Sequence, residues 1–278
     1  MIYDVRARSG AVMPNLGIGT WRMGENDACR REEIAALRLG LELGMRLIDT
    51  AEMYADGGAE TVVAEAIQVR RERVFVVSKV LPQHAGYAET LAACERSLKR
   101  LRTDFIDLYL LHWPSDHPLD GTLRAFVRLE EQGKIRHYGL SNFDLDEMAR
   151  AEELPGGARI AANQVLYNVE RRGIERTLIP WCLSRNVAIM AYSPFEQGRL
   201  RFKDGLRRVA ERHGATPAQV ALAWTLRHDN VVAIPKATRS AHIIDNAKAT
   251  EIVFTEDDLA DIDRAYPPPR RDVPLETL

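Results

Sequence analysis

Short runs of β-branched and other apolar residues alternate with longer segments of helical periodicity along almost the whole chain. Most of these runs are separated by roughly 25 to 31 residues, which is typical of repeated strand-plus-helix units. Eight parallel strands with intervening helices predict a closed (β/α)8 TIM barrel of the α/β class, because an open doubly wound sheet usually has about five to seven strands. The expected strands begin at Leu16, Arg46, Val74, Phe105, Ile135, Ile160, Val187 and Val231.

The interval before the last strand is longer, at roughly 44 residues, and exceeds one strand-plus-helix unit. It predicts an extra helix near residues 201–213, between strands seven and eight, followed by a helix at 217–227. No composition break or Ser/Gly linker divides the chain, so we expect residues 1–278 to form a single barrel domain. The C-terminal tail after Asp261 should run over the surface or across one mouth of the barrel.

Composition restricts the partners and the location of the protein. Lys and Arg number 38 and Asp and Glu number 40, so no net field attracts polyanions, and we expect no nucleic acid partner. No run approaches the roughly 18 apolar residues that span a bilayer, and the N-terminal MIYDVRARSG has no apolar signal core, so we expect no membrane association. Three isolated cysteines fit a reducing compartment, and the expected location is cytoplasmic. A helix-covered barrel can work alone, so a monomer is the expected state.

Ionisable side chains stand at the ends of three consecutive predicted strands, where a parallel barrel carries its chemistry. The second strand ends in Asp49 and leads to Tyr54, the third ends in Lys79, and the fourth ends in His112. Taken singly, a carboxylate can cap a turn, a loop tyrosine can face solvent, a strand lysine can extend into water, and a histidine can be a bonded core residue. Their occurrence at neighbouring strand ends favours a site that moves a proton.

Motifs along nearly the whole chain resemble those of the aldo-keto reductases, barrel enzymes that reduce carbonyls with NADPH. DTAEMYADGGAE, together with NQVLYN and PWC, resembles the bacterial branch that includes methylglyoxal reductases. The resemblance implies an NADPH-dependent oxidoreductase that reduces small aldehydes and ketones, methylglyoxal among them, to alcohols. The motifs are DTAEMYADGGAE at 49–60, VSKV at 77–80, LYLLHWP at 108–114, GLSNF at 139–143, NQVLYN at 163–168, AYSPF at 191–195 and IPKAT at 234–238.

The resemblance implies a catalytic tetrad of Asp49, Tyr54, Lys79 and His112. Tyr54 would donate the proton to the carbonyl oxygen as hydride arrives at carbon. We expect Lys79 to lower the pKa of this phenol, since one ammonium at about 4 Å supplies roughly 4 kcal/mol at an effective dielectric near 20, or about three pKa units. Asp49 would keep the ammonium charged, and a neutral His112 would orient the carbonyl by a hydrogen bond.

The resemblance also implies the residues that hold the cofactor. Ser141, Asn142 and Gln164 would bind the nicotinamide carboxamide, and Tyr192 would stack on the ring. Lys236 is the expected partner of the 2′-phosphate. The remaining expected cofactor contacts are Gly19, Thr20, Ser193, Pro194, Arg199, Thr238, Arg239, His242, Asp245 and Asn246.

Three positions, His242, Phe195 and Glu196, depart from the family pattern. His242 stands where an arginine is usual, and because a neutral imidazole is a poorer anion partner than guanidinium, NADH stays as an alternative to NADPH. Arg239, three residues earlier, is a substitute partner for the phosphate. Glu196 would be unfavourable near a pyrophosphate unless it points away or contacts Arg199.

Trp21 and Trp113 stand at the ends of the first and fourth strands, and the resemblance places them in the substrate pocket. They would line an apolar pocket for a small carbonyl substrate, with core packing at the barrel mouth as the alternative.

Other cofactor and metal motifs fail in this sequence. GIGTWRMG has Arg22 where a dinucleotide-binding loop requires its third glycine, and no H-x-H or H-E-x-x-H pair is present, so no metal is expected. The alternative function is a nucleotide-binding barrel that acts as a redox-sensing or regulatory subunit. Such a subunit needs the cofactor loops but not a complete tetrad.

Overall fold

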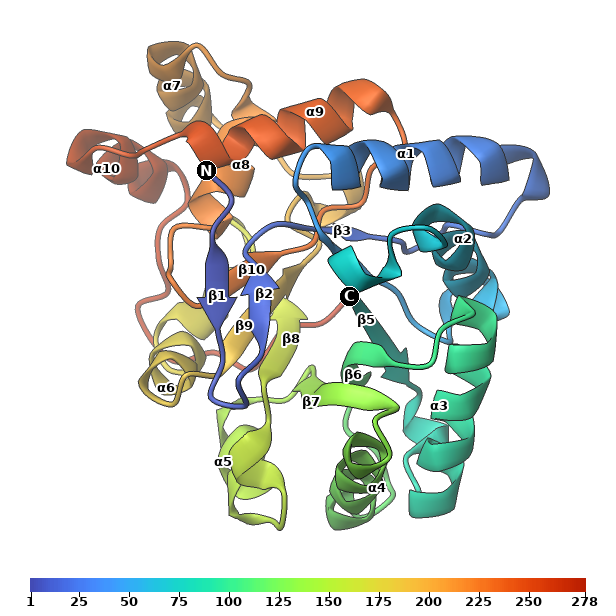
Figure 1. Ribbon diagram of the computed structural model, residues 1–278. Helices are drawn as coiled ribbons and strands as arrows, with labels where there is room; N and C mark the ends of the chain where they lie inside the picture. The colour runs from blue at the N-terminus through green and yellow to red at the C-terminus, as the bar shows by residue number, and fades with distance from the viewer.

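A computed structural model describes residues 1–278 and contains the expected eight-stranded parallel barrel (Figure 1). Neighbouring strands pair in chain order, and the barrel closes where Leu16 bridges Ala233 in parallel. Each strand lies within a predicted run, so the prediction of the barrel is confirmed. The strands are β3 (Gly17–Gly19), β4 (Leu47–Asp49), β5 (Phe75–Val80), β6 (Ile106–Leu111), β7 (Ile135–Ser141), β8 (Ala162–Leu166), β9 (Ala188–Tyr192) and β10 (Val231–Ala233).

Helices surround the barrel wall, and the predicted extra helix is α7. Gly214 ends α7 in the left-handed conformation, and α8 then begins with a capping box between Thr216 and Gln219 and with Pro217 in its first turn. The helices are α1 (Arg30–Glu42), α2 (Gly58–Ile67), α3 (Tyr87–Leu101), α4 (Leu119–Glu131), α5 (Leu145–Glu153), α6 (Leu178–Ser184), α7 (Asp204–His213), α8 (Pro217–Thr225), α9 (Ser240–Lys248) and α10 (Glu256–Ala265).

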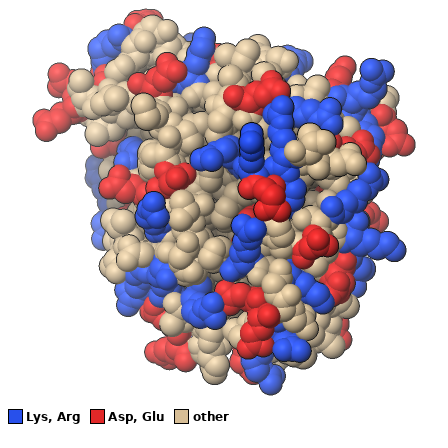
Figure 2. All heavy atoms as spheres, in the orientation of Figure 1, with Lys and Arg blue, Asp and Glu red and all other residues tan.

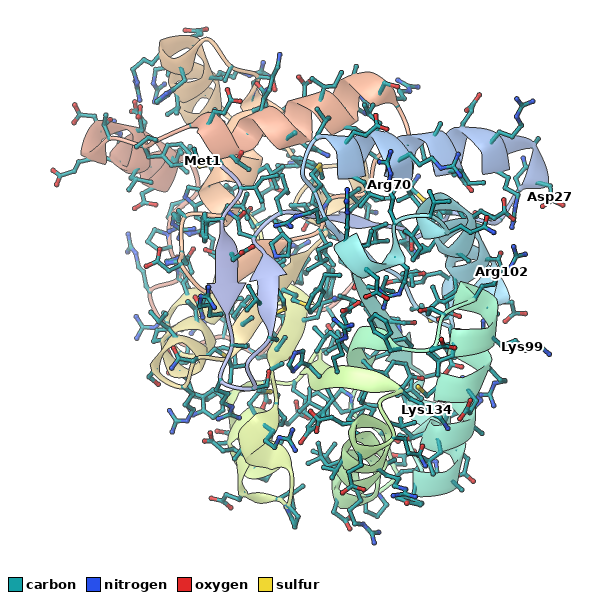
Figure 3. The ribbon with its side chains drawn as sticks, in the orientation of Figure 1. Met1, Asp27, Arg70, Lys99, Arg102 and Lys134 are labelled. Carbon is teal, nitrogen blue, oxygen red and sulfur yellow. The ribbon has the colours of Figure 1, made fainter.

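The outer helices bury one face against the barrel. In α3 the buried residues recur at helical intervals, among them Ala93, Ser97 and Leu101. Lys99 and Arg102 lie on the outer edge of the molecule, away from the barrel (Figure 3). The strands are buried on both faces, as β6 is along its whole length, because the inner face meets the barrel core and the outer face meets helices.

An antiparallel hairpin, β1 (Asp4–Arg6) and β2 (Val12–Pro14), precedes the barrel and is absent from the sequence-based prediction. Met13 is fully buried among the side chains that fill the barrel interior. The Arg8 amide donates to the carbonyl of Asn186, just before β9, so the hairpin covers the amino-terminal mouth of the barrel. Strands of three residues give too little alternation to be detected in the sequence.

The C-terminal tail crosses the opposite mouth, which is one of the two paths expected for it. Asp272 pairs with Arg176 at 2.8 Å, and Glu276 pairs with Arg171 at 2.6 Å. Both arginines lie on the loop after β8, at the carboxyl end of that strand. The tail therefore borders the end of the barrel where the tetrad side chains are found.

The surface carries both signs of charge. On the face shown in Figure 2, basic and acidic side chains are interspersed, and no large area of that face has one sign only. No helix combines the length and the apolar character that crossing a bilayer requires.

Candidate functional site

The four tetrad residues meet at the carboxyl ends of β4, β5 and β6. Lys79 is fully buried, and its Nζ lies 2.8 Å from Asp49 Oδ2 and 3.2 Å from the Tyr54 hydroxyl. Its third hydrogen bond goes to the carbonyl of Thr50 at 2.8 Å. Because an ammonium has three protons, all of its donors are used, and the amine is fixed in one position.

A tight turn places Tyr54 over Lys79. Tyr54 begins the 3₁₀ segment η2 (Tyr54–Gly57), in which Ala55 and Asp56 have φ of 50° and 54°. Such left-handed conformations are unfavourable for residues with a side chain and persist where the surroundings hold them. Buried Glu52 anchors the turn, since its Oε1 accepts from the Leu81 amide at 2.9 Å. Sequence reasoning missed Glu52, although its position within DTAEMY between two tetrad residues was visible.

The electrostatics of the Tyr54–Lys79 pair differ from the expectation. Burial raises the pKa of Tyr54 above its ordinary value, and the positive charge of Lys79 only partly opposes this. The expected lowering of this pKa is therefore wrong for the structure. Burial alone would lower the pKa of Lys79, but Asp49 and Tyr54 outweigh it and raise that pKa. At neutral pH the site holds a neutral phenol beside a charged ammonium.

His112 lies against the same phenol. Its ring centroid is 5.9 Å from that of Tyr54 in an edge-to-face arrangement, and 3.9 Å from that of Trp113, on which it stacks. Burial, aided by the charge of Lys79, lowers the pKa of His112 to about 2. The imidazole is therefore neutral, as expected, and its buried Nδ1 has no hydrogen-bond partner. A neutral ring can donate one hydrogen bond to a carbonyl oxygen.

The predicted nicotinamide-binding residues form one hydrogen-bonded group on β7, β8 and β9. The Ser141 hydroxyl donates to the carbonyl of Gln164 at 2.9 Å. Asn142, with φ of 62°, donates to the carbonyl of His112 at 3.0 Å and accepts from the Tyr192 hydroxyl at 2.9 Å. The group thus joins the tetrad strands to the half-buried ring of Tyr192.

Asp49 connects this hydrogen-bonded group to Thr20, which follows β3. Its Oδ1 accepts from Gln164 Nε2 at 2.8 Å, and its carbonyl accepts from the Thr20 hydroxyl at 2.9 Å. A Cβ added at Gly19 would lie 2.8 Å from the carbonyl oxygen of Ile234, which is closer than a side chain tolerates. Glycine at this position therefore allows the end of β3 to lie close to the loop after β10, and no side chain covers the backbone there.

Exposed basic side chains lie at the N-terminus of α9 and in the loop before it. Lys236, Arg239 and His242 are exposed, and Arg239 precedes the helix without a side-chain cap on its first amides. Free amides at a helix N-terminus beside basic side chains can bind an anion such as a phosphate. Thr238 lies in the same loop. On the helix itself, Asp245 accepts from Gln219 at 3.2 Å, and Asn246 is buried.

Glu196, in the loop after β9, points away from Arg199 and toward the loop after β8. This carboxylate is buried and accepts from Asn168 Nδ2 at 2.7 Å and from Arg171 at 3.3 Å. It therefore points into the loop after β8, while Arg199 bonds only to the carbonyl of residue 196 and to Gln197. Ser193 and Pro194 stand at the start of the loop. Asn168 and Arg171 are functional candidates that the sequence analysis missed.

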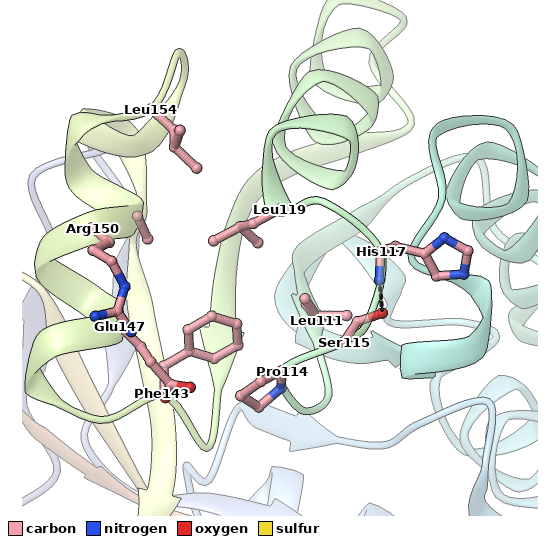
Figure 4. A pocket seen from close by; sticks show the side chains of 10 residues that line it. Leu111, Pro114, Ser115, His117, Leu119, Phe143, Glu147, Arg150 and Leu154 are labelled. Carbon is pink, nitrogen blue, oxygen red and sulfur yellow. Dashed lines mark hydrogen bonds between the residues drawn. The ribbon is translucent and has the colours of Figure 1, made fainter.

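The two predicted pocket tryptophans occupy different environments. Trp113 packs on His112, whereas Trp21 at the end of β3 is 39% exposed and has the guanidinium of Arg22 5.5 Å from its ring. Trp113 follows His112 directly, and Trp21 follows β3, the neighbour of β4. A separate open groove of about 360 Å³ lies outside the barrel between the loop after β6 and α5, with apolar walls that include Leu111 and Phe143 (Figure 4). None of its lining residues belongs to the tetrad.

Comparison with known proteins gives consistent similarities. Residues 15–267 match the model of the aldo/keto reductase family. Methylglyoxal reductase YeaE of Escherichia coli (strain K12) is 49% identical over 273 residues, which are 96% of this chain and 95% of that protein. Glyoxal reductase of Bacillus subtilis (strain 168) is 36% identical over 261 residues, which are 93% and 91% of the two chains.

Solved structures show the same likeness. A crystal structure of an aldo/keto reductase from Klebsiella pneumoniae in complex with NADP and acetate has a TM-score of 0.97 and 48% identity, and the comparison covers 100% of both chains. A second structure from that organism, in complex with NADPH, has a TM-score of 0.96 and 48% identity over the same coverage.

Proposed function

The chain belongs to the aldo/keto reductase family, and on that premise we propose that it reduces small aldehydes and ketones, with methylglyoxal as the leading substrate, to alcohols with NADPH. The observation that carries the proposal is the Lys79 ammonium, fixed 3.2 Å from the Tyr54 hydroxyl at the mouth of the barrel. A regulatory subunit that only binds a nucleotide would not need this pair.

The residues around the tetrad fit a nicotinamide dinucleotide phosphate. Ser141, Asn142 and Gln164 would hold the carboxamide, and Tyr192 would support one face of the ring. Lys236, with Arg239 in place of the arginine that His242 replaces, would meet the 2′-phosphate at the N-terminus of α9. When bound, the cofactor supplies the hydride that is added to the carbonyl carbon. The similarity to enzymes crystallised with NADP and NADPH supports this choice over NADH.

Tyr54 is the proton donor in this proposal. Its O–H bond breaks as the carbonyl oxygen gains negative charge, and the proton moves to that oxygen to complete the alcohol. The phenolate left behind lies beside the Lys79 ammonium, an attraction of about 4 kcal/mol at an effective dielectric near 20. The raised pKa of Tyr54 keeps the donor protonated before the reaction.

The other two tetrad residues act on position and charge. Asp49 holds Lys79 charged and aimed through the 2.8 Å contact. Neutral His112 would donate to the carbonyl oxygen and place it within reach of Tyr54. Trp113, stacked on His112, and Trp21 would confine a small substrate, which agrees with the names of the methylglyoxal and glyoxal reductases that resemble the chain.

The test is carbonyl-dependent oxidation of NADPH across a panel of small aldehydes, with and without methylglyoxal. Tyr54→Phe should lower kcat by roughly 10² to 10⁴ while leaving NADPH binding close to wild type. Tyr138→Phe is a matched control, because Tyr138 lies on β7 with its hydroxyl bonded to the carbonyl of Gly156, away from the tetrad. Wild-type turnover in Tyr54→Phe would exclude Tyr54 as the donor. Tight NADPH binding without oxidation by any carbonyl would favour the regulatory alternative.

A further inference from the structure

Arg171 joins two segments that are distant in the sequence. Its Nε and Nη2 each lie 3.3 Å from the carboxylate of Glu196, in the loop after β9. Its Nη1 donates to Glu276 in the C-terminal tail at 2.6 Å. One guanidinium is therefore the common partner of a loop expected to bind the cofactor and of a tail that borders the substrate opening.

The loop after β9 is held in an unfavourable conformation. Ser193, Glu196 and Gln197 have φ of 51°, 49° and 55°, in the left-handed region that residues with a side chain rarely adopt. Such a backbone persists only where surrounding contacts hold it. The Glu196 side chain provides those contacts, through Arg171 and through Asn168 Nδ2 at 2.7 Å.

Asn168 fixes the backbone turn that carries Arg171. It is fully buried, its Oδ1 accepts from the amides of Glu170 at 2.8 Å and Arg171 at 3.0 Å, and its Nδ2 also donates to the carbonyl of Ser193 at 2.9 Å. The turn that presents the guanidinium is therefore set by the barrel itself. Arg171 meets both segments from a rigid position.

The tail follows the same β8 loop to the site. Asp272 pairs with Arg176, and the side chain of Val273 lies so close to Gly173 that an added Cβ would be 2.6 Å from its Cγ2. After the Arg171–Glu276 pair, the chain ends at Leu278, whose backbone lies near the Tyr192 hydroxyl and acts to lower its pKa, although burial raises that pKa to about 12. The pair thus stands just before the point where the tail reaches the ring expected to support the nicotinamide.

We infer that Arg171 is a positioning residue that sets the cofactor loop and the C-terminal tail together. Its contact with Glu196 holds residues 193–198 in their strained form, ready for the cofactor, and its contact with Glu276 holds the chain end at Tyr192. The inference rests on the proposed function for its cofactor and its substrate. It predicts that loss of the Arg171 side chain weakens both cofactor binding and substrate binding. Loss of the Glu276 carboxylate should weaken substrate binding alone.

The first test titrates NADPH into each protein and follows tryptophan fluorescence, without any carbonyl present. Arg171→Met should raise the NADPH Kd roughly threefold to tenfold, a modest change because the guanidinium is partly exposed. Glu196→Gln, which keeps the shape of the side chain, should change the Kd in the same direction. Glu276→Gln should leave the Kd within about twofold and raise the KM for the aldehyde. Arg176→Met is the matched control, since it pairs with the tail but not with the cofactor loop, and it should keep the wild-type Kd.

The second test uses amide hydrogen exchange on the protein without cofactor. Peptides covering residues 193–200 and 270–278 should both exchange faster in Arg171→Met, and only the latter in Glu276→Gln. Wild-type Kd values and exchange rates in Arg171→Met would overturn the role of Arg171 while leaving the proposed function intact. A wild-type protein that does not bind NADPH would overturn the proposed function, and the cofactor role of Arg171 with it.

Discussion

The side-chain amide of Gln164 donates to Asp49 Oδ1 at 2.8 Å, while the other oxygen of the same carboxylate accepts from Lys79 at 2.8 Å. One buried carboxylate therefore serves a residue proposed to bind the cofactor and a residue proposed to tune the proton donor. Because both contacts lie in a dry site, a change at Gln164 is expected to reach the tetrad.

Replacement of Gln164 should affect binding and chemistry together. Gln164→Leu removes a donor from buried Asp49 and a polar partner from the carboxamide, so we expect the NADPH Kd to rise roughly tenfold and kcat to fall by a similar factor. Equilibrium titration and steady-state kinetics measure the two effects separately. The exposed Gln132, at the end of α4, gives the control Gln132→Leu, which should change neither. A rise in Kd with unchanged kcat would show that Asp49 does not transmit the change.

The buried ion pair between Lys79 and Asp49 predicts a distinctive pattern of stability. Lys79→Met leaves an unpaired carboxylate in a fully buried site, and we expect it to lose about 3–5 kcal/mol of the free energy of unfolding. The double variant Lys79→Met/Asp49→Asn removes both charges and should recover much of that loss, while both proteins stay nearly inactive. Urea unfolding followed by circular dichroism measures this. Additive losses in the double variant would contradict the account.

The pH profile of carbonyl reduction should be level around neutrality. The donor must be protonated, and because the pKa of Tyr54 is raised above its ordinary value near 10, kcat should hold up to about pH 9 and fall only as the pH rises further. His112, with a pKa of about 2, should add no acidic limb. His112→Gln should therefore lower kcat without changing the profile between about pH 5 and 8. An acidic limb near 6.5 that disappears in this variant would show that His112 titrates there.

Asp258 should make the stability of the protein depend on pH. Burial acts to raise its pKa, but the bond to the Thr255 amide and the contacts with His213 and Arg212 outweigh it and lower that pKa below the ordinary value. A carboxyl with a lowered folded pKa stabilises the fold above its unfolded pKa of about 4 and loses that effect as the pH falls.

Asp258→Asn should therefore lower Tm at pH 7 and flatten the fall of Tm below about pH 4, because Asp258 accepts from the Thr255 amide in the capping box of α10 and pairs with His213 at 2.8 Å. Thermal unfolding from acid to neutral pH measures both effects. Asp257→Asn, in the same first turn but outside the capping box, is the matched control. Parallel Tm curves for wild type and Asp258→Asn would contradict the assignment.

Much of the fold and of the site could be predicted from the sequence, because both follow from periodicity. Each strand of the barrel has a local apolar signal, and a parallel barrel necessarily brings the ends of neighbouring strands together, so Asp49, Lys79 and His112 meet as expected. The extra helix between strands seven and eight was predictable from the length of the interval before the last strand. Gly214, which ends this helix, and Thr216, which caps the following helix α8, were also visible.

The remaining features depend on contacts that no local pattern encodes. Arg171 and Glu196 are 25 residues apart, and nothing in either neighbourhood indicates that they meet. The expected direction of the Tyr54 pKa shift was wrong because the expectation included the charge of Lys79 but not the loss of water around the phenol. Desolvation can be judged only once the depth of a group in the fold is known.

The hairpin β1–β2 closes the barrel at its amino-terminal end. Met13 is buried in the barrel interior and the chain before β9 is hydrogen-bonded to the hairpin, so the hairpin covers the amino-terminal mouth. The proposed cofactor and the proposed substrate would then both enter, and the product would leave, through the carboxyl-terminal mouth that the tail borders. Residues at the carboxyl-terminal mouth, including the last few of the chain, are therefore positions where substitutions could change the rates of binding and release without changing the tetrad.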